Sequence, residues 1–244
     1  MPRRARSLLS ECYVHVINRS AHKVPLFERS KDYRDFLRIL REGLERHPVR
    51  LVAYCLMSNH WHLVVAPVGS AVLSRLMHWV TTTHAVRFRK RRSGRGRGPV
   101  YEGRFKSHPV DGLGHLLDVI RWVERNALAA NLVSSAEDWP WGSLADRQRS
   151  APEVPLEGAS FLSSRAWIEQ VNASHSLDEA RLCDLAEDPG ARKRGEKRGR
   201  VGGRRRNDQA HAHVERAKHL RVLKLPGPLQ PTEQRRNRPA LAIK

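Results

Sequence analysis

The chain has 244 residues, enough for one domain with a sizeable core and an extension. Its 45 lysines and arginines against 25 acidic residues give a formal charge of +20, which favours a polyanionic partner, with nucleic acid ahead of an acidic membrane surface. Its start lacks the apolar segment of a secretion signal, no apolar run could span a bilayer, and three widely spaced cysteines argue against a disulfide framework. We therefore expect a cytoplasmic protein without a membrane partner.

Seven regular elements are predicted from apolar periodicity, which has a period of two in strands and 3.6 in helices. In chain order they are a strand at 12–18, a helix at 31–47, strands at 49–57 and 60–67, a helix at 70–91, a strand or short hairpin at 100–110, and a helix at 112–133. The first six follow the split βαβ order of the ferredoxin-like fold, an α+β fold in which helices cover one face of an antiparallel sheet. The seventh is an added C-terminal helix.

Apolar periodicity weakens after the segment EDWPWGSL, which ends at Leu144. The run from Arg192 to Arg206 has nine basic residues and one acid, and it is rich in glycine, which is typical of disorder. We expect one domain at residues 1–150 and a basic, largely disordered extension at 151–244, with a possible short helix at 163–171.

The strand expected at 60–67 begins with two histidines. His60 and His62 would share one face of the sheet while Trp61 points to the other, a geometry that suits two ligands of one metal ion. Spacing alone supports a metal site and ordinary hydrogen-bonding histidines equally, and a second such pair, His211 and His213, lies in the polar tail.

Four blocks of sequence, in order between about Tyr13 and Leu144, resemble one family. The segments MSNHWHLVV, YEGRFKS, RWVERNALAANLV and EDWPWGSL are similar to those of the single-strand DNA transposases with a histidine, hydrophobic, histidine (HUH) motif, the IS200-like transposase domain, in the branch called REP-associated tyrosine transposases. The resemblance implies a ferredoxin-like fold and metal-dependent cleavage and strand transfer of single-stranded or hairpin DNA. It also implies a chromosome-associated prokaryotic protein, acting as a monomer or a homodimer.

The resemblance assigns roles to particular residues. In the family, two histidines and a polar residue of the last helix bind a divalent metal, which maps onto His60, His62 and Asn126. Two histidine nitrogens, an amide oxygen and waters suit Mg²⁺ or Mn²⁺ better than zinc.

The family's nucleophilic tyrosine maps onto Trp122, whose indole has no oxygen to attack phosphorus. Tyr13, Tyr33, Tyr54 and Tyr101 align with non-catalytic positions. Two hypotheses follow: an active transposase or nickase, and an inactive, domesticated protein that binds hairpin DNA.

Basic residues in two segments are candidates for contact with DNA phosphates. Residues 87–97 hold seven basic residues and no acid, more than a helix end needs to complement its own dipole. In the segment GRFKS, two basic residues flank Phe105 and would share one strand face, where they serve equally well to block unwanted sheet pairing. A general RNA-binding protein is the third reading. The predicted DNA-binding residues are Arg87, Arg89, Lys90, Arg91, Arg92, Arg95, Arg97, Arg104 and Lys106.

Overall fold

The computed structural model describes residues 13–21, 24–92, 98–158 and 160–173. Arg95, Arg97, the tail histidines and the basic run at 192–206 lie outside the described residues. The elements in chain order are β1 (Tyr13–Arg19), α1 (Ser30–Arg46), β2 (Val49–Met57), β3 (His60–Pro67), α2 (Ser70–Arg91), β4 (Lys106–Val110), α3 (Gly112–Ala129), η2 (Ala136–Asp138), α4 (Ser143–Arg147), η3 (Ser160–Ser163) and α5 (Arg165–Asn172).

The four strands form one antiparallel sheet in the order β2-β3-β1-β4. β2 and β3 form a hairpin through the turn at Ser58-Asn59, as the polar pair between two apolar runs predicts. The split βαβ connection then brings β1 between β3 and β4. The predicted ferredoxin-like α+β fold is confirmed.

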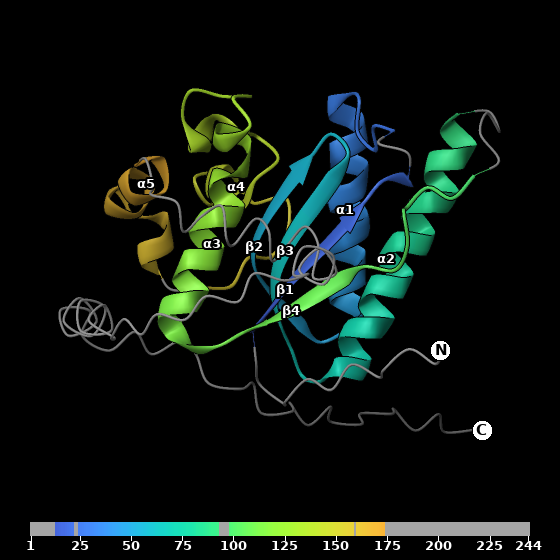
Figure 1. The fold of residues 1–244 in the computed structure, drawn as a ribbon, viewed down its shortest axis with the longest axis horizontal. Helices are drawn as coiled ribbons and strands as arrows, with labels where there is room; N and C mark the ends of the chain where they lie inside the picture. Colours follow the sequence, from blue (N-terminus) through green and yellow to red (C-terminus); the bar gives the residue numbers. More distant parts are fainter. Residues whose placement is uncertain (1–12, 22–23, 93–97, 159, 174–244) are drawn as a thin grey trace, which may run out of the picture.

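Helices cover both faces of the sheet (Figure 1). α1 and α2 lie on one face, while α3, the predicted added helix, lies on the other with α4 and α5 beside it. The alternation of side chains along β3 separates the two cores: Trp61, Leu63 and Val65 pack with α1 and α2, and Val64 packs with α3. His60 and His62 have the parity of Val64 and so belong to the α3 face.

The α1 and α2 layer is joined to the sheet almost entirely by apolar side chains. The predicted stripe of α1 is buried, with Phe36, Leu37 and Leu40 each 0% exposed. The two helices approach closely at Gly43, where a Cβ atom would lie 2.9 Å from Leu76 Cδ1. A glycine in the middle of a helix therefore has a packing role here.

The α3 layer is held by a buried polar network as well as by apolar packing. Glu124 of α3 is 2% exposed and accepts hydrogen bonds from Ser143 Oγ at 2.7 Å and Trp167 Nε1 at 2.8 Å. It also forms an ion pair with Arg147, which donates to the carbonyl of Val52 in β2. One carboxylate thus ties α3 to α4, α5 and the sheet.

Packing on the sheet continues beyond the domain boundary expected at residue 150. Val154, Leu162 and Val171 are buried, and the short helix expected at 163–171 is α5. The described part of the extension is therefore a layer of the domain up to residue 173. None of the helices in the described ranges is long and apolar enough to cross a bilayer.

Candidate functional site

Four histidines gather on the side of the sheet that faces α3. β3 holds the rings of His60 and His62 with centroids 5.0 Å apart and nearly perpendicular. The pairing of β1 with β3 brings His15 alongside, with its Nε2 3.1 Å from His62 Nδ1. β4 then places His108 directly opposite His15. We call the set His15, His60, His62 and His108 the histidine face.

The environment of His62 and His15 favours their neutral forms. Burial, followed by the nearby His60, His15 and Arg19, lowers the pKa of His62 well below its usual value. Burial and the neighbouring His108 and His115 lower the pKa of His15 to about 3. Neutral imidazoles keep one nitrogen lone pair, which is the form that binds a metal ion.

The turn before β3 orients the first histidine. His60 Nδ1 lies 2.7 Å from Asn59 Oδ1, and because an amide oxygen only accepts, Nδ1 is the donor. In the neutral form of His60 the proton would thereby be on Nδ1 and the lone pair on Nε2. This fits a metal ligand, whose second nitrogen commonly donates to a neighbouring oxygen.

Trp122 of α3 closes the histidine face. Its ring stands edge-on to His62 at 4.7 Å between centroids and to His15 at 5.3 Å, and the residue is 8% exposed. The apolar stripe that aims this helix at the sheet, Leu116, Ile120 and Val123, is buried as predicted. The structure thus brings His60, His62 and Trp122 together.

Asn126 lies one helical turn beyond Trp122 and is half-buried. Within the described ranges, no group of three or more His, Cys, Asp or Glu side chains is arranged to hold one metal ion. The metal site predicted at His60 and His62 would therefore need oxygen ligands, for which Asn126 stays the predicted protein source.

The four tyrosines of the chain all lie in the described residues, and none of them is on the helix that carries Trp122. Tyr101 is buried on the opposite face, where its hydroxyl lies 2.7 Å from His84 Nδ1 and 3.4 Å from Trp61 Nε1. Tyr33 stacks on Trp141, and Tyr54 is in the α1 and α2 core. Tyr13 begins β1 opposite Val110 and packs against the cluster on the α3 face that includes Trp122. The aromatic side chain that stands edge-on to His62 from α3 is the indole of Trp122.

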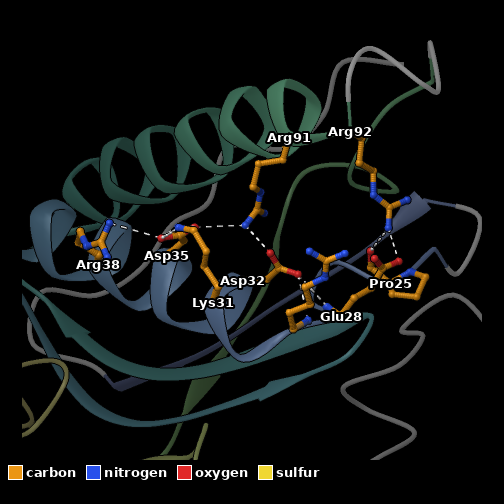
Figure 2. Close-up of polar contacts among 9 residues, drawn as sticks. Pro25, Glu28, Lys31, Asp32, Asp35, Arg38, Arg91 and Arg92 are labelled. Carbon is orange, nitrogen blue, oxygen red and sulfur yellow. Dashed lines mark hydrogen bonds and ion pairs between the residues drawn. The ribbon is translucent and has the colours of Figure 1, made fainter.

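Acidic residues of α1 and of the segment just before it pair with arginines at the basic end of α2 (Figure 2). Arg91 lies 2.6 Å from Asp32 and 3.3 Å from Asp35, and Arg92 lies 2.5 Å from Glu28. Along the same helix, Arg87 pairs with Glu42 and Arg89 donates to the carbonyl of Gly98, while Lys90 is exposed. Contact of these residues with DNA stays a prediction, and it now competes with ion pairs inside the molecule.

The start of β4 carries basic side chains on the outer surface. Phe105 is buried in the α1 and α2 core while Arg104 and Lys106 are exposed, in line with the alternation expected from the sequence. Lys106 has the parity of His108 along β4, and with burial it lowers the pKa of that histidine. Lys106 is therefore a cation at the edge of the histidine face.

Sequence reasoning missed four residues of this site. His15 and Arg19 share the strand parity of β1, and Arg19 pairs opposite His60, but only the strand order brings them to β3. His108 reaches the site through the same order, and Asn59 was read as a turn residue alone. The available signal was the alternation of His15, Ile17 and Arg19 in a strand next to the histidine pair.

Comparison with known proteins bears on the same residues. The model of the family described as "Transposase IS200 like" matches residues 8–126, from just before β1 to Asn126. A solved structure described as a REP-associated tyrosine transposase bound to a REP hairpin is 14% identical, with a TM-score of 0.47, covering 67% of this chain and 94% of that one.

A crystal structure of a protein from Deinococcus radiodurans R1, provisionally described as a transposase, is 16% identical, with a TM-score of 0.35, covering 51% of this chain and 97% of that one. The comparison with curated proteins found no match. The matched segment contains the strands, the histidine pair and the helix that carries Trp122, so the part of the chain that forms the site is the part that is similar to the IS200-like transposase family.

Proposed function

We propose that this protein binds single-stranded or hairpin DNA of the REP type at the histidine face and does not become covalently joined to it. One observation carries the proposal: the Trp122 ring packs edge-on against His62 and His15, in the position where the resemblance expects a phenol. Similarity to a transposase family supports DNA as the ligand.

The chemistry of the family explains why this residue is decisive. A phenol oxygen that attacks the scissile phosphate becomes a 5′-phosphotyrosine while the 3′-oxygen leaves, and this bond conserves the energy needed for rejoining. An indole carries no such oxygen. Strand transfer therefore lacks its covalent carrier at position 122.

The metal part of the proposal assigns Mg²⁺ or Mn²⁺ to His60, His62 and Asn126. A divalent ion of this kind, when bound, polarises a phosphoryl oxygen and orients the phosphate. The chain's own contribution is to present two imidazoles on one strand, with Asn59 accepting a hydrogen bond from Nδ1 of His60. The fit rests on the donor set and on this hydrogen bond.

The test compares the natural protein with Trp122→Tyr and Trp122→Phe. Each is incubated with end-labelled hairpin DNA and Mn²⁺, and covalent adducts are resolved on a denaturing gel. We expect binding without adduct for the natural protein and for Trp122→Phe, and an adduct for Trp122→Tyr, because a phenol there would stand beside His62. The phenylalanine variant separates the effect of the oxygen from that of the smaller ring.

Nicking or adduct formation by the natural protein would instead establish the active transposase or nickase. Competition between hairpin DNA and RNA of the same sequence tests the ligand class. Equal competition would favour a general RNA-binding protein, and preference for DNA supports the proposal.

A further inference from the structure

Of the four histidines on the histidine face, His15 has no assigned role. It is 5% exposed, and its Nε2 lies 3.1 Å from Nδ1 of His62, a nitrogen-to-nitrogen contact within hydrogen-bond reach. One nitrogen donates and the other accepts, so the pair has two arrangements. In one, His62 carries its proton on Nδ1, and in the other on Nε2.

The two arrangements differ in what they leave for a ligand. With the proton on Nδ1, His62 donates to His15 and keeps the lone pair on Nε2. With the proton on Nε2, His62 accepts from His15 and has no lone pair left for a cation. The direction of the hydrogen bond between His15 and His62 thus decides whether His62 has a lone pair for a metal ion.

The neighbouring histidine indicates which arrangement serves the site. His60 Nδ1 donates to Asn59 Oδ1 at 2.7 Å, which leaves its Nε2 open. The two rings lie on one face 5.0 Å apart, and because Nδ1 of each has a polar neighbour, Nε2 is the nitrogen of each that would bind a cation between them. Asn59 supplies the acceptor for one ring, and His15 lies within hydrogen-bond reach of the other.

We propose that His15 is a positioning residue that accepts a hydrogen bond from His62 Nδ1, as Asn59 does from His60, and so holds His62 Nε2 open for a divalent cation. The inference rests on the proposed metal site for its consequence, while the hydrogen bond itself stands on the structure. Trp122 reinforces the arrangement because it packs edge-on against both rings and limits their rotation.

The test uses Mn²⁺ alone, titrated into the full chain and followed by electron paramagnetic resonance of the free ion. His15→Phe, which keeps a ring but no acceptor, is expected to weaken Mn²⁺ binding by about 10- to 100-fold, the usual cost of losing a hydrogen-bond partner of a ligating histidine. His15→Gln, whose amide oxygen takes the place of Nε2, is expected to recover most of the affinity. His84→Phe, a buried histidine on the opposite face, is expected to leave it unchanged.

Nitrogen-15 spectra of the histidines in the metal-free natural protein give a readout that needs neither variant nor metal. They distinguish a proton on Nδ1 from one on Nε2, and we expect Nδ1 for both His60 and His62. A proton on Nε2 of His62, or Mn²⁺ binding by His15→Phe within about twofold of the natural protein, overturns the role of His15. Failure of the natural protein to bind Mn²⁺, with the Nδ1 form present, refutes the metal site of the proposed function and leaves the hydrogen bond established.

Discussion

Both faces of the sheet bury a histidine, and the surroundings differ. His84, on the α1 and α2 face, is 1% exposed and touches the rings of Phe27, Phe36 and Phe88, with one polar partner in Tyr101. His62, on the α3 face, is 2% exposed but sits among other histidines, close to Arg19. Burial lowers the pKa of both, so a lowered pKa does not by itself mark a functional site. What distinguishes the α3 face is that several nitrogen donors gather there.

The two layers also differ in how they are attached. α1 and α2 pack through apolar side chains, whereas α3 is pinned by the carboxylate of Glu124. Since α3 carries Trp122 and Asn126, the contacts of Glu124 also hold the candidate site in place. Substitutions that remove one kind of contact at a time therefore test whether the two layers are held in different ways.

The largest expected effect is the loss of Glu124. Glu124→Ala leaves Arg147, 7% exposed, without its carboxylate partner, and removes the acceptor of Ser143 and Trp167. Breaking a buried ion pair from one side costs about 3–5 kcal/mol. Urea unfolding should show this loss in the free energy of unfolding.

The matched control is Glu169→Ala, which removes an exposed partner of Arg165 in α5 and should change stability by less than about 1 kcal/mol. Equal effects of the two substitutions would mean that α3 is held by its apolar side chains alone, like the other layer.

The next effect concerns acid and His84. Burial lowers the pKa of His84 to about 3, with Arg91 lowering it and Asp32 and Asp35 raising it. The unfolded chain, with a histidine pKa of about 6.5, binds the proton first, so stability is complete above that value and is lost as the pH falls toward 3. Between pH 6.5 and 5.0, one such histidine costs about 1.5 kcal/mol.

His84→Phe removes the contribution of this one histidine to the loss of stability in acid. Urea unfolding of the natural protein and the variant at pH 6.5 and 5.0 should show that the variant loses about 1.5 kcal/mol less over this interval. His15 and His62 keep their own acid sensitivity in both proteins, because burial lowers the pKa of each. An identical loss in both proteins would contradict the assignment of a neutral, buried His84.

A smaller effect separates the two groups of basic residues. Lys106 is an exposed cation with the parity of His108, whereas Arg91 is held by Asp32 and Asp35 (Figure 2). Lys106→Gln should weaken DNA binding and reduce the slope of log affinity against log salt by about 1, the share of one phosphate contact. Arg91→Gln should leave the slope unchanged. The reverse result would assign the DNA surface to the end of α2.

The local elements were predictable because their periodicity and turns are local. The strands at 49–57 and 60–67, the helix at 70–91 and the shared face of His60 and His62 follow from alternation, helical spacing and one polar turn. The helix predicted at 112–133 ends earlier in the structure, at Ala129. In the segment 100–110, predicted as a strand or short hairpin, the strand β4 starts only at Lys106.

The rest of the site depends on residues brought together from distant parts of the chain. His15 and His62 are 47 positions apart, and only the placement of β1 beside β3 joins them. The basic end of α2 was read as a phosphate surface because the acidic edge of α1 that pairs with it lies 59 positions earlier, at Asp32. Charge along a segment does not reveal which charges a neighbouring helix will neutralise.

Two glycines test the packing of each layer with the same substitution, and the effects are expected to have opposite signs. Gly114, near the start of α3, has open space where a Cβ would lie, so Gly114→Ala should stabilise the protein by about 0.5 kcal/mol through helix propensity. At Gly43 the added Cβ would meet Leu76, Val80 and Trp79 at 2.9–3.2 Å, and overpacking of about 1–3 kcal/mol should outweigh the propensity gain. Thermal unfolding should therefore move in opposite directions, upward for Gly114→Ala and downward for Gly43→Ala. An upward shift for both would mean that α1 and α2 can separate slightly at no cost, so that the apolar layer is the more adaptable of the two.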